Sequence, residues 1–383
     1  MDRIYITPCH FGLEAVLKRE ITNLGYRIEK VEDGRVSWFG DDAACARANM
    51  FLRTTERVLL LAGRFHAETF DELFEKTKSI PWEELLPEDA KFWVAKANSL
   101  KSRLFSPSDI QSIMKKAIVE RLKQKYHREW FPETGASFPI RVSILKDEVT
   151  IGVDTTGTSL HKRGYRQAAS KAPISETLAA ALLLLTPWKG GRILVDPFCG
   201  SGTFPIEAAM IASNMAPGRQ RSFLSEEWKG MPSEIWERAR EEADDLLDLS
   251  ADSDIQGYDL DGSVIRHARE NAVRAGVDKQ IHFQQRPLSA LSHSGSYGFL
   301  VANPPYGERL EEKEALPALY ETLGERFSHL DTWSMYLITA YEDAEKCIGR
   351  KAAKNRKIYN GMLKTYFLQY PGPKPPRRNE QDH

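Results

Sequence analysis

Apolar and polar positions alternate regularly in the second half of the chain. Short apolar runs, typical of strands buried on both faces, are separated by segments in which apolar residues recur every three or four positions. Strands are predicted at 193–195, 255–259, 281–284, 297–302 and 333–338, and helices at 175–185, 206–211, 262–275, 315–329 and 342–348. This order is typical of an α/β fold with a doubly wound parallel sheet. Two final strands, near 357–359 and at 362–370, flank the turn Asn360-Gly361 and are predicted to be antiparallel.

The part of the chain before residue 157 mixes strands and helices without that strict alternation. Strands are predicted at 3–7, on both sides of Asp33-Gly34, and at 57–65, 91–98, 138–145 and 149–153, with helices at 11–24, from 41, at 69–79 and at 107–125. This pattern predicts an α+β module. Ser106 is suited to cap the last helix and Pro107 to fill its first turn, while Ile110, Met114 and Ile118 share one face.

Charge is segregated locally although its sum is close to zero. The 383 residues include 53 Lys and Arg and 54 Asp and Glu, so no global field indicates a nucleic-acid partner. Residues 115–128 and 350–357 are nonetheless strongly basic, while 226–254 is acidic and contains a helix at 231–248 that is predicted to be an insertion. A basic helix face is usually just solvated. Its alternative role is RNA contact through Lys115, Lys116 and Lys123.

Cysteine spacing and hydropathy indicate in which cellular compartment the protein is expected. Cys9, Cys45, Cys199 and Cys347 lack the spacing of a metal site, so no metal is predicted, and reduced thiols are expected. Cys199 has no histidine near it in sequence and is interpreted as a packed thiol rather than a nucleophile. The apolar stretch 178–185 is too short to span a bilayer, and no signal pattern opens the chain. A soluble cytoplasmic protein without a membrane partner is predicted.

A glycine-rich loop follows the strand at 193–195. It runs from Asp196 to Thr203 and contains Gly200 and Gly202, which allow the backbone to approach a ligand. A dinucleotide fingerprint requires a third glycine where this chain has Pro205. Asp196 suits a ligand that carries an ammonium group, and Asp259, after the next strand, can accept hydrogen bonds from both ribose hydroxyls. These features favour S-adenosylmethionine over a nicotinamide dinucleotide.

A second polar loop, Asn303-Pro304-Pro305-Tyr306, follows the strand at 297–302. Its two prolines restrict the backbone to an extended and stiff conformation. The Asn303 side chain and the Pro304 carbonyl offer two acceptors that can converge on the hydrogens of an amino group, while Tyr306 can stack on a flat ring. We call Asn303, Pro304 and Tyr306 the amine clamp. Taken alone, the short motif is equally compatible with a structural turn.

Three segments in order, DPFCGSGT (196–203), GYDLD (257–261) and NPPYGERL (303–310), resemble the class I Rossmann-like methyltransferases that act on amino nitrogens of bases. Together with HKRGYR (161–166), they resemble the THUMP-containing RNA guanine-N2-methyltransferases of the RlmL/YpsC-like group. The resemblance implies a ferredoxin-like segment at 1–66, a THUMP RNA-binding domain at 67–156, a linker at 157–175 and a methyltransferase domain at 176–383.

The resemblance also implies site residues. Cofactor contacts are expected from one group and base contacts from the amine clamp; the cofactor group is Asp196, Phe198, Gly200, Gly202 and Asp259. Such enzymes often place an aspartate near the adenine after the third strand. This chain has Gln284-Gln285-Arg286-Pro287 there, so Gln285 or the local backbone is expected to replace it. In the linker, Arg163, Tyr165 and Arg166 around Gly164 are expected to face RNA.

The function implied is methyl transfer from S-adenosylmethionine to the N2 amine of a guanosine, in large-subunit (23S) rRNA. The clamp would hold an adenine amine equally well, so a DNA adenine-N6 methyltransferase is an alternative, as is a guanine-N2 methyltransferase that acts on tRNA. A non-enzymatic RNA-binding protein of ribosome assembly would keep the basic surfaces without requiring Asn303.

Overall fold

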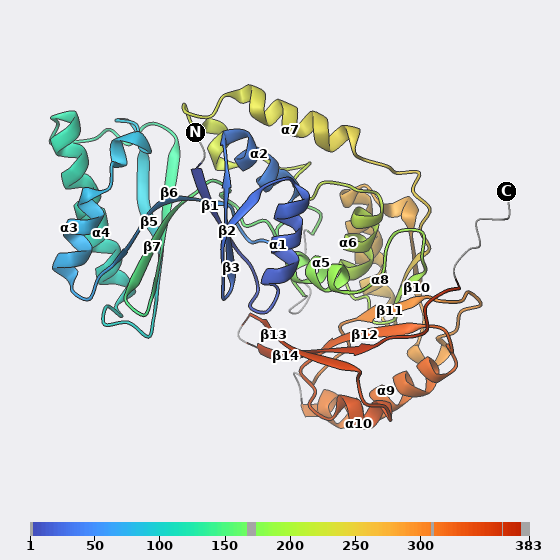
Figure 1. Cartoon of the computed structure of the whole chain (residues 1–383). Helices are drawn as coiled ribbons and strands as arrows, with labels where there is room; N and C mark the ends of the chain where they lie inside the picture. Colours follow the sequence, from blue (N-terminus) through green and yellow to red (C-terminus); the bar gives the residue numbers. More distant parts are fainter. Residues whose placement is uncertain (1–2, 167–173, 308–309, 362, 377–383) are drawn as a thin grey trace. The chain divides into compact units, whose positions relative to one another are not determined.

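The computed structural model describes residues 3–166, 174–307, 310–361 and 363–376, without the side chains of 310–312 (Figure 1). The chain divides into two compact units. The first consists of Met1–Cys9, Leu17–Leu160 and Arg221–Glu242, and the second of His10–Val16, His161–Gln220 and Ala243–His383. Each unit thus takes one segment from within the sequence span of the other.

The first unit is built on one seven-stranded sheet in the order β2-β3-β1-β4-β7-β6-β5. Its elements are β1 (Arg3–Pro8), α1 (Glu14–Asn23), β2 (Arg27–Glu32), β3 (Arg35–Gly40), α2 (Asp42–Phe51), β4 (Leu59–His66), α3 (Phe70–Ser79), β5 (Lys91–Leu100), α4 (Pro107–Tyr126), β6 (Ser137–Leu145) and β7 (Glu148–Asp154). β5 and β6 are parallel, and the other neighbouring strands are antiparallel. Because β4 pairs with both β1 and β7, the sheet runs continuously from the ferredoxin-like strands into the later ones.

Helix α4 forms where the sequence predicted it. The Ser106 hydroxyl accepts a hydrogen bond from the Asp109 amide at 3.4 Å, and Pro107 occupies the first turn. Ile110, Met114 and Ile118 are completely buried. Helices α3 and α4 lie side by side in this unit, and α4 packs against β5 (Figure 1). The apolar face therefore covers the sheet and leaves the lysine-bearing face at the surface.

The predicted acidic insertion contains α7 (Ser233–Asp245), most of which belongs to the first unit. Before this helix, the Trp228 ring stacks on Phe138 of β6 with 4.6 Å between centroids, and its indole N–H donates to the Ser137 carbonyl at 3.0 Å. At the far end, the Arg47 guanidinium forms two hydrogen bonds of 2.7 Å with Glu242. An apolar anchor and a bidentate ion pair thus hold the insertion on the first unit.

The second unit contains a seven-stranded sheet in the order β10-β9-β8-β11-β12-β14-β13. Its elements are α5 (Glu176–Leu185), β8 (Leu194–Asp196), α6 (Thr203–Ala212), β9 (Ile255–Asp259), α8 (Gly262–Ala275), β10 (Ile281–Gln285), β11 (Phe299–Ala302), α9 (Leu310–Ser328), β12 (Ser334–Thr339), α10 (Ala344–Ile348), β13 (Lys354–Asn360) and β14 (Leu363–Tyr370). The five strands from β10 to β12 are parallel, and β14 and β13 are antiparallel. This is the doubly wound parallel sheet with a final antiparallel pair that the pattern predicted. Met362, the predicted start of the last strand, lies outside the described residues.

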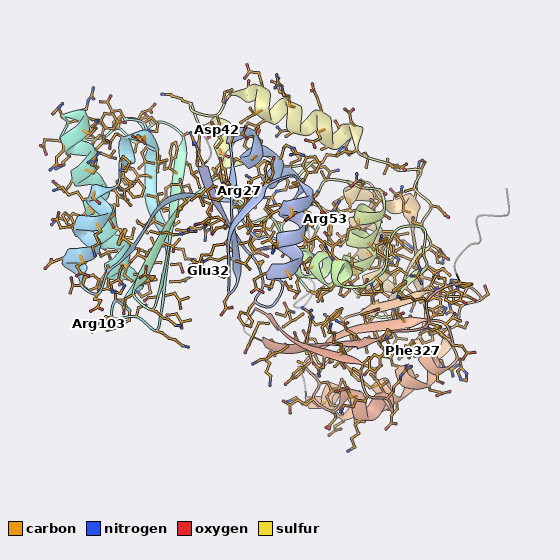
Figure 2. All side chains as sticks on the ribbon, viewed as in Figure 1. Arg27, Glu32, Asp42, Arg53, Arg103 and Phe327 are labelled. Atoms are coloured by element: carbon orange, nitrogen blue, oxygen red, sulfur yellow. The ribbon has the colours of Figure 1, made fainter. Side chains whose placement is uncertain are left out.

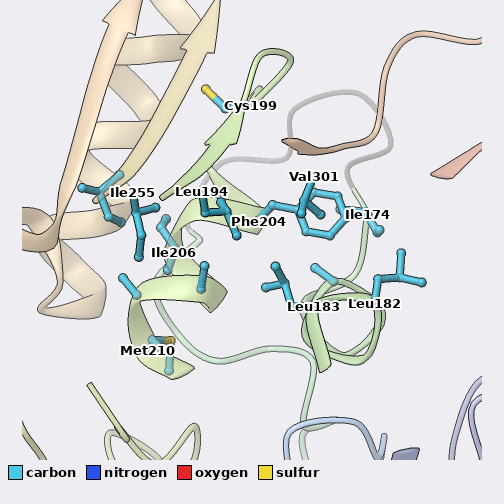
Figure 3. Packing of buried hydrophobic residues seen from close by; sticks show 14 of the residues in the cluster. Ile174, Leu182, Leu183, Leu194, Cys199, Phe204, Ile206, Met210, Ile255 and Val301 are labelled. Atoms are coloured by element: carbon cyan, nitrogen blue, oxygen red, sulfur yellow. The ribbon is translucent and has the colours of Figure 1, made fainter. Parts of the chain in front are cut away.

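The central strand β11 is buried on both faces. Phe299 and Val301 belong to one apolar cluster together with residues of α5, α6 and α8, while Leu300 and Ala302 belong to a second cluster with residues of α9 and α10. Figure 3 shows part of the first cluster, with Phe204 and Ile206 of α6 and Leu182 and Leu183 of α5. Because both faces are covered, the polar residues that follow these strands gather at the carboxyl edge of the sheet.

Of the helices in the described ranges, none is both long enough and apolar enough to cross a membrane.

Candidate active site

A cavity of about 550 Å³ opens at the carboxyl edge of the second unit's sheet. Its wall comes from the segments after four neighbouring strands and from α9; the residues are Pro197, Phe198, Asp259, Leu260, Pro287, Leu288, Ser289, Asn303, Pro304, Pro305, Tyr306, Gly307, Leu319 and Thr322. This edge is where open α/β sheets bind ligands, and the volume suits a cofactor-sized molecule. Asp259, Phe198 and the whole amine clamp therefore share one cavity.

Asp259, the last residue of β9, is held by two backbone amides. One carboxylate oxygen accepts from the Gly200 N–H and the other from the Asp261 N–H, both at 3.0 Å. Each oxygen keeps a second acceptor position, which suits the two adjacent hydroxyls of a ribose. Asp261 itself caps α8 by accepting a hydrogen bond from the Ser263 amide at 2.8 Å.

The glycine-rich loop connects this wall to α6. Gly200 and Gly202 have φ angles of +49° and +86°, a region that side-chain-bearing residues rarely adopt. A Cβ atom on Gly202 would also lie 2.9 Å from the Phe283 ring. Pro205 lies in the first turn of α6, where its missing N–H removes no helical hydrogen bond. The loop thus follows a path that only glycine adopts readily at these two positions.

Asp196, at the end of β8, is buried and accepts a hydrogen bond from the Phe198 amide at 3.0 Å. Burial raises the pKa of its carboxyl well above the usual range, and nearby Asp259 adds to this. Asp196 and the two glycines do not form part of the cavity wall. The Asp196 carboxyl instead binds the Phe198 amide, and the Gly200 amide binds Asp259. Phe198 and Asp259 both line the cavity.

The predicted adenine contact, Gln285, is also absent from the cavity wall among the described residues. Its side-chain amide donates to the Leu260 carbonyl at 2.9 Å and lies beside Gly262. The wall on this side is formed by Pro287, Leu288 and Ser289. This is the local stretch that the sequence offered as the other possibility, and it leaves Gln285 with a role in fixing the β9–α8 connection.

The amine clamp lies directly after β11. Asn303, Pro304, Pro305, Tyr306 and Gly307 all contribute to the wall, and Gly307 has a φ of +78° that allows the chain to turn into α9. Glu308 and Arg309, the next two residues of the motif, lie outside the described residues. The cavity therefore brings the predicted base-binding residues and the predicted ribose-binding residue together.

The segment 161–166 has a different environment from the one expected. Arg163 and Tyr165 are only 3% and 2% exposed, and both bind Glu207 of α6, which is fully buried. Arg166 is half-buried, donates to the Thr203 hydroxyl at 2.5 Å and pairs with Glu176 at 3.6 Å. The expected RNA contacts of Arg163 and Tyr165 do not fit this burial, because a buried ion pair presents no surface to a phosphate. The described part of the predicted linker is packed against α6 instead.

The three lysines predicted to contact RNA lie on α4, and acidic neighbours partly neutralise that face. Lys115 is 3.9 Å from Glu133, and Lys123 pairs with Glu120 and Glu129 at 3.7 and 2.9 Å. Lys116 lies over the Phe74 ring at 5.9 Å. On the loop before α4, Arg103 is also exposed and pairs with Glu68 at 2.5 Å (Figure 2). The positive field of this face is therefore weaker than its lysine count indicates.

Metal and thiol chemistry receive no support from the geometry. No cluster of three or more His, Cys, Asp or Glu residues that could hold a metal ion occurs in the part of the chain that the structure describes. Burial raises the pKa of the Cys199 thiol well above its usual range, with further contributions from Asp196 and Asp259. A protonated, buried thiol is a poor nucleophile, which agrees with the interpretation of Cys199 as a packed residue.

Comparison with known protein families assigns the second unit to a domain family. A family model described as the RMKL-like methyltransferase domain matches residues 163–369. The chain belongs to this methyltransferase family. Two further models match the RMKL-like chain upstream: an RlmL ferredoxin-like domain at residues 5–59 and a THUMP domain at 67–154. The family that the three motifs predicted is confirmed.

Relatives and solved structures resemble the RMKL-like chain over nearly its whole length. YpsC of Bacillus subtilis, which is named as an RNA methyltransferase, is 45% identical over 99% of this chain and 98% of its own length. The ribosomal RNA large subunit methyltransferase K/L of Syntrophotalea carbinolica is 34% identical over 94% of this chain, which spans only 52% of that relative.

Among solved structures, SMU.472, a methyltransferase in complex with SAH, is 42% identical with a TM-score of 0.92 and aligns over 98% of this chain and 99% of its own. A Listeria monocytogenes structure described as a predicted N6-adenine-specific DNA methylase is 49% identical with a TM-score of 0.92 over 97% of both chains. The names of these similar proteins thus point to different acceptors.

Some residues of the site carried no signal in the sequence. Leu319 and Thr322 reach the cavity from α9, and Leu288 and Ser289 from the segment after β10. None of them has a catalytic side chain or belongs to a short motif. The signal that could have predicted the Leu319 and Thr322 contacts is the place of α9 in the chain, directly after the clamp.

Proposed function

We propose that this RMKL-like methyltransferase transfers a methyl group from S-adenosylmethionine to the N2 amine of a guanosine in RNA, with large-subunit rRNA as the target. The observation that carries the proposal is the shared cavity, which Asp259 and the amine clamp both line. A methyl donor whose ribose binds Asp259 and a base whose amine binds the clamp would meet inside it.

The residues fit the donor chemically. Asp259 has acceptor positions for two hydroxyls, and Phe198, Pro197 and Leu260 give the same wall an apolar character. Asp196, which is buried outside the cavity wall, would act on the ammonium end of the donor through its charge rather than by lining the cavity. The Pro287–Ser289 stretch provides a surface for the adenine ring. When bound, the donor supplies an electrophilic methyl group on a sulfonium.

The clamp accounts for the acceptor chemistry. The lone pair of an aromatic amine is shared with its ring, so the nitrogen is a weak nucleophile. If Asn303 and the Pro304 carbonyl accept its two hydrogens, they favour a pyramidal nitrogen and direct its lone pair toward the methyl group. Placement and fixed dipoles then supply most of the acceleration. As the nitrogen–methyl bond forms, the methyl–sulfur bond would break and leave a neutral thioether. The alkylated nitrogen is acidic and would lose its proton to water without a strong general base.

The acceptor base must leave any helix to enter such a cavity. Enzymes that modify a base inside a pocket act on single strands or on a flipped nucleotide that stacks on an aromatic side chain. Tyr306 lines the cavity and would take this role. Lys115, Lys116 and Lys123 on α4 of the first unit are proposed phosphate contacts, and the THUMP match at 67–154 covers that helix.

Guanine and rRNA are favoured by the family rather than by one side chain. The match to the RMKL-like domain and the likeness to a large-subunit rRNA methyltransferase support this acceptor. DNA adenine-N6 methylation is the second candidate, because the clamp accepts either amine and a similar structure is described as an adenine-specific DNA methylase. The THUMP domain favours RNA over DNA.

Nucleoside mass spectrometry tests the proposal directly. Total rRNA, tRNA and DNA are isolated from wild-type cells, from a strain lacking this gene and from the deletion strain that expresses Asn303→Ala. We expect N2-methylguanosine in large-subunit rRNA to fall in the deletion strain and to remain low with the variant. A loss of N2-methylguanosine confined to tRNA would show that tRNA, not rRNA, is the substrate. A loss of N6-methyladenine from DNA would contradict guanine as the acceptor. Full restoration of the modification by Asn303→Ala would contradict the proposed role of the amine clamp.

A further inference from the structure

Tyr320 of α9 connects the amine clamp to the sheet from behind. Its side chain is fully buried, and it lies between Leu319 and Thr322, neighbours on the helix that line the cavity while Tyr320 does not. The Tyr320 hydroxyl donates to the carbonyl of Pro305 at 3.2 Å. The same hydroxyl is 2.6 Å from the hydroxyl of Thr339 at the end of β12.

The direction of these hydrogen bonds follows from the number of protons. A phenol has one proton, so if Tyr320 donates to Pro305, the Thr339 hydroxyl must donate to Tyr320. The Thr339 oxygen in turn accepts from the Tyr341 amide at 3.0 Å. The four groups thus form one chain of donors, from the Tyr341 N–H through Thr339 and Tyr320 to the Pro305 carbonyl. Burial also raises the pKa of Tyr320, so the phenol keeps its proton at ordinary pH.

This chain fixes the backbone at the point where the clamp has its remaining freedom. The rings of Pro304 and Pro305 restrict φ at both residues, but the direction of the Pro305 carbonyl depends on ψ. That carbonyl belongs to the peptide that leads into Tyr306, and Gly307, with a φ of +78°, follows. Holding the carbonyl therefore sets the direction in which the Tyr306 ring leaves the loop.

The anchors of this chain are rigid. Thr339 is fully buried and ends a central strand whose neighbour β11 carries the clamp. The Tyr320 ring packs on the Tyr341 ring with 5.0 Å between centroids. Tyr320 and Thr339 are the buried members of this chain, while Pro305 lies at its exposed end. The two buried hydroxyls hold one geometry, because leaving either of them without a partner is costly. The structure thus places a stiff support between the sheet and the base-stacking residue.

We propose that Tyr320 is a positioning residue for methyl transfer, acting through the Pro305 carbonyl to hold Tyr306 and the clamp in the geometry that the acceptor base needs. This inference rests on the proposed role of the clamp. Tyr320 does not touch the substrate, so its removal should slow the transfer step and leave cofactor binding intact.

The test compares Tyr320→Phe with the matched control Tyr341→Phe. The first substitution removes only the hydroxyl that holds Pro305, while the second removes a hydroxyl of the same kind but keeps the Tyr341 backbone amide. Initial rates of labelled methyl transfer from S-adenosylmethionine to rRNA from the deletion strain give kcat and KM, and calorimetry gives the S-adenosylmethionine Kd. We expect Tyr320→Phe to lower kcat by about 10- to 100-fold, with the cofactor Kd unchanged and Tyr341→Phe close to wild type.

Thr339→Val removes the next member of the chain. If Tyr320 and Thr339 act as one unit, the double variant should be no slower than Tyr320→Phe alone. Asn303→Ala, measured in parallel, separates the two proposals. A wild-type kcat in Tyr320→Phe beside an inactive Asn303→Ala would overturn the positioning role alone, and so would an equal loss in Tyr341→Phe. Full activity in Asn303→Ala would overturn the proposed function itself.

Discussion

The clamp loop at 303–307 and the segment at 161–166 are both short motifs with aromatic and polar side chains, yet their environments are opposite. The first lines a cavity at the end of a central strand, with its described support coming from Tyr320 behind it. In the second, Arg163 and Tyr165 are buried against Glu207. The contrast teaches that the place of a motif in the fold, rather than its charge, separates contact with a ligand from structural support.

The largest effect that tests this comparison is expected when the Arg163 charge is removed. Arg163→Met would leave the buried Glu207 carboxylate without its cationic partner and with the Tyr165 hydroxyl still bound. Breaking a buried ion pair in this way costs about 3–5 kcal/mol of folding free energy. Chemical denaturation should show this loss, while Lys162→Ala, at the exposed neighbour, should leave stability unchanged. A stable Arg163→Met protein with weakened RNA binding would restore the surface role that the sequence suggested.

A substitution of Asp259 tests whether the residues that line the cavity bind the cofactor. Asp259→Asn keeps the size of the side chain but removes its charge and replaces one acceptor oxygen with a donor amide, which then faces the N–H of either Gly200 or Asp261. We expect S-adenosylmethionine Kd to rise by about 10- to 100-fold, since the lost acceptor serves charge-assisted hydrogen bonds. Calorimetry measures this, with Asp261→Asn as the control because asparagine caps helices equally well. An unchanged Kd would remove Asp259 from the cofactor site.

The buried carboxyl of Asp196 predicts a pH dependence. Its raised pKa means that the folded protein holds the proton more tightly than the unfolded chain, so this contribution to stability is present at low pH and lost as pH rises through the folded pKa. A bound ammonium group favours the ionised form, so S-adenosylmethionine affinity should increase over the same interval.

Calorimetry between about pH 5 and 7, below the usual α-amino pKa, measures this dependence. We expect Asp196→Asn to bind more weakly and with a flat pH profile. An unchanged slope in the variant would assign the titration to another group.

The smallest effect is expected on α4. Lys116→Ala should weaken RNA binding by less than about tenfold and lower the slope of log K against log salt by about 1. Lys123→Ala should change the affinity and the salt slope less, because Glu120 and Glu129 already pair with that lysine. Binding of fragmented rRNA at several salt concentrations measures both slopes. Equal slopes in wild type and Lys116→Ala would show that RNA does not contact the protein through Lys116 of this helix.

The sequence predicted what depends on local order along the chain. The strands of the second unit, the caps of α4 and the loops after β8 and β11 follow from periodicity and from residues within one element. The parallel pairing of β5 with β6 and the stacking of Trp228 on Phe138 could not be predicted, because each depends on a partner far away in the sequence.

The same reason explains where the structure surrounds the predicted site residues with partners that the sequence did not indicate. Arg163 resembles an exposed cation until Glu207, 44 residues later, is brought against it. Gln285 was offered for the adenine, but its amide reaches the Leu260 carbonyl, directly after the neighbouring strand β9. Leu319 and Thr322 carry no chemical mark that distinguishes a cavity wall from a helix surface.

The central claim is that the loop after β11 clamps an amine beside the methyl donor. Its most direct test is single-turnover methyl transfer by Asn303→Ala, at saturating S-adenosylmethionine, to rRNA from the deletion strain. Removing the side-chain acceptor should slow the transfer step by about 10²- to 10³-fold, as for other preorganised catalytic dipoles, while S-adenosylmethionine Kd stays within about twofold of wild type. A wild-type rate in this variant would contradict the account.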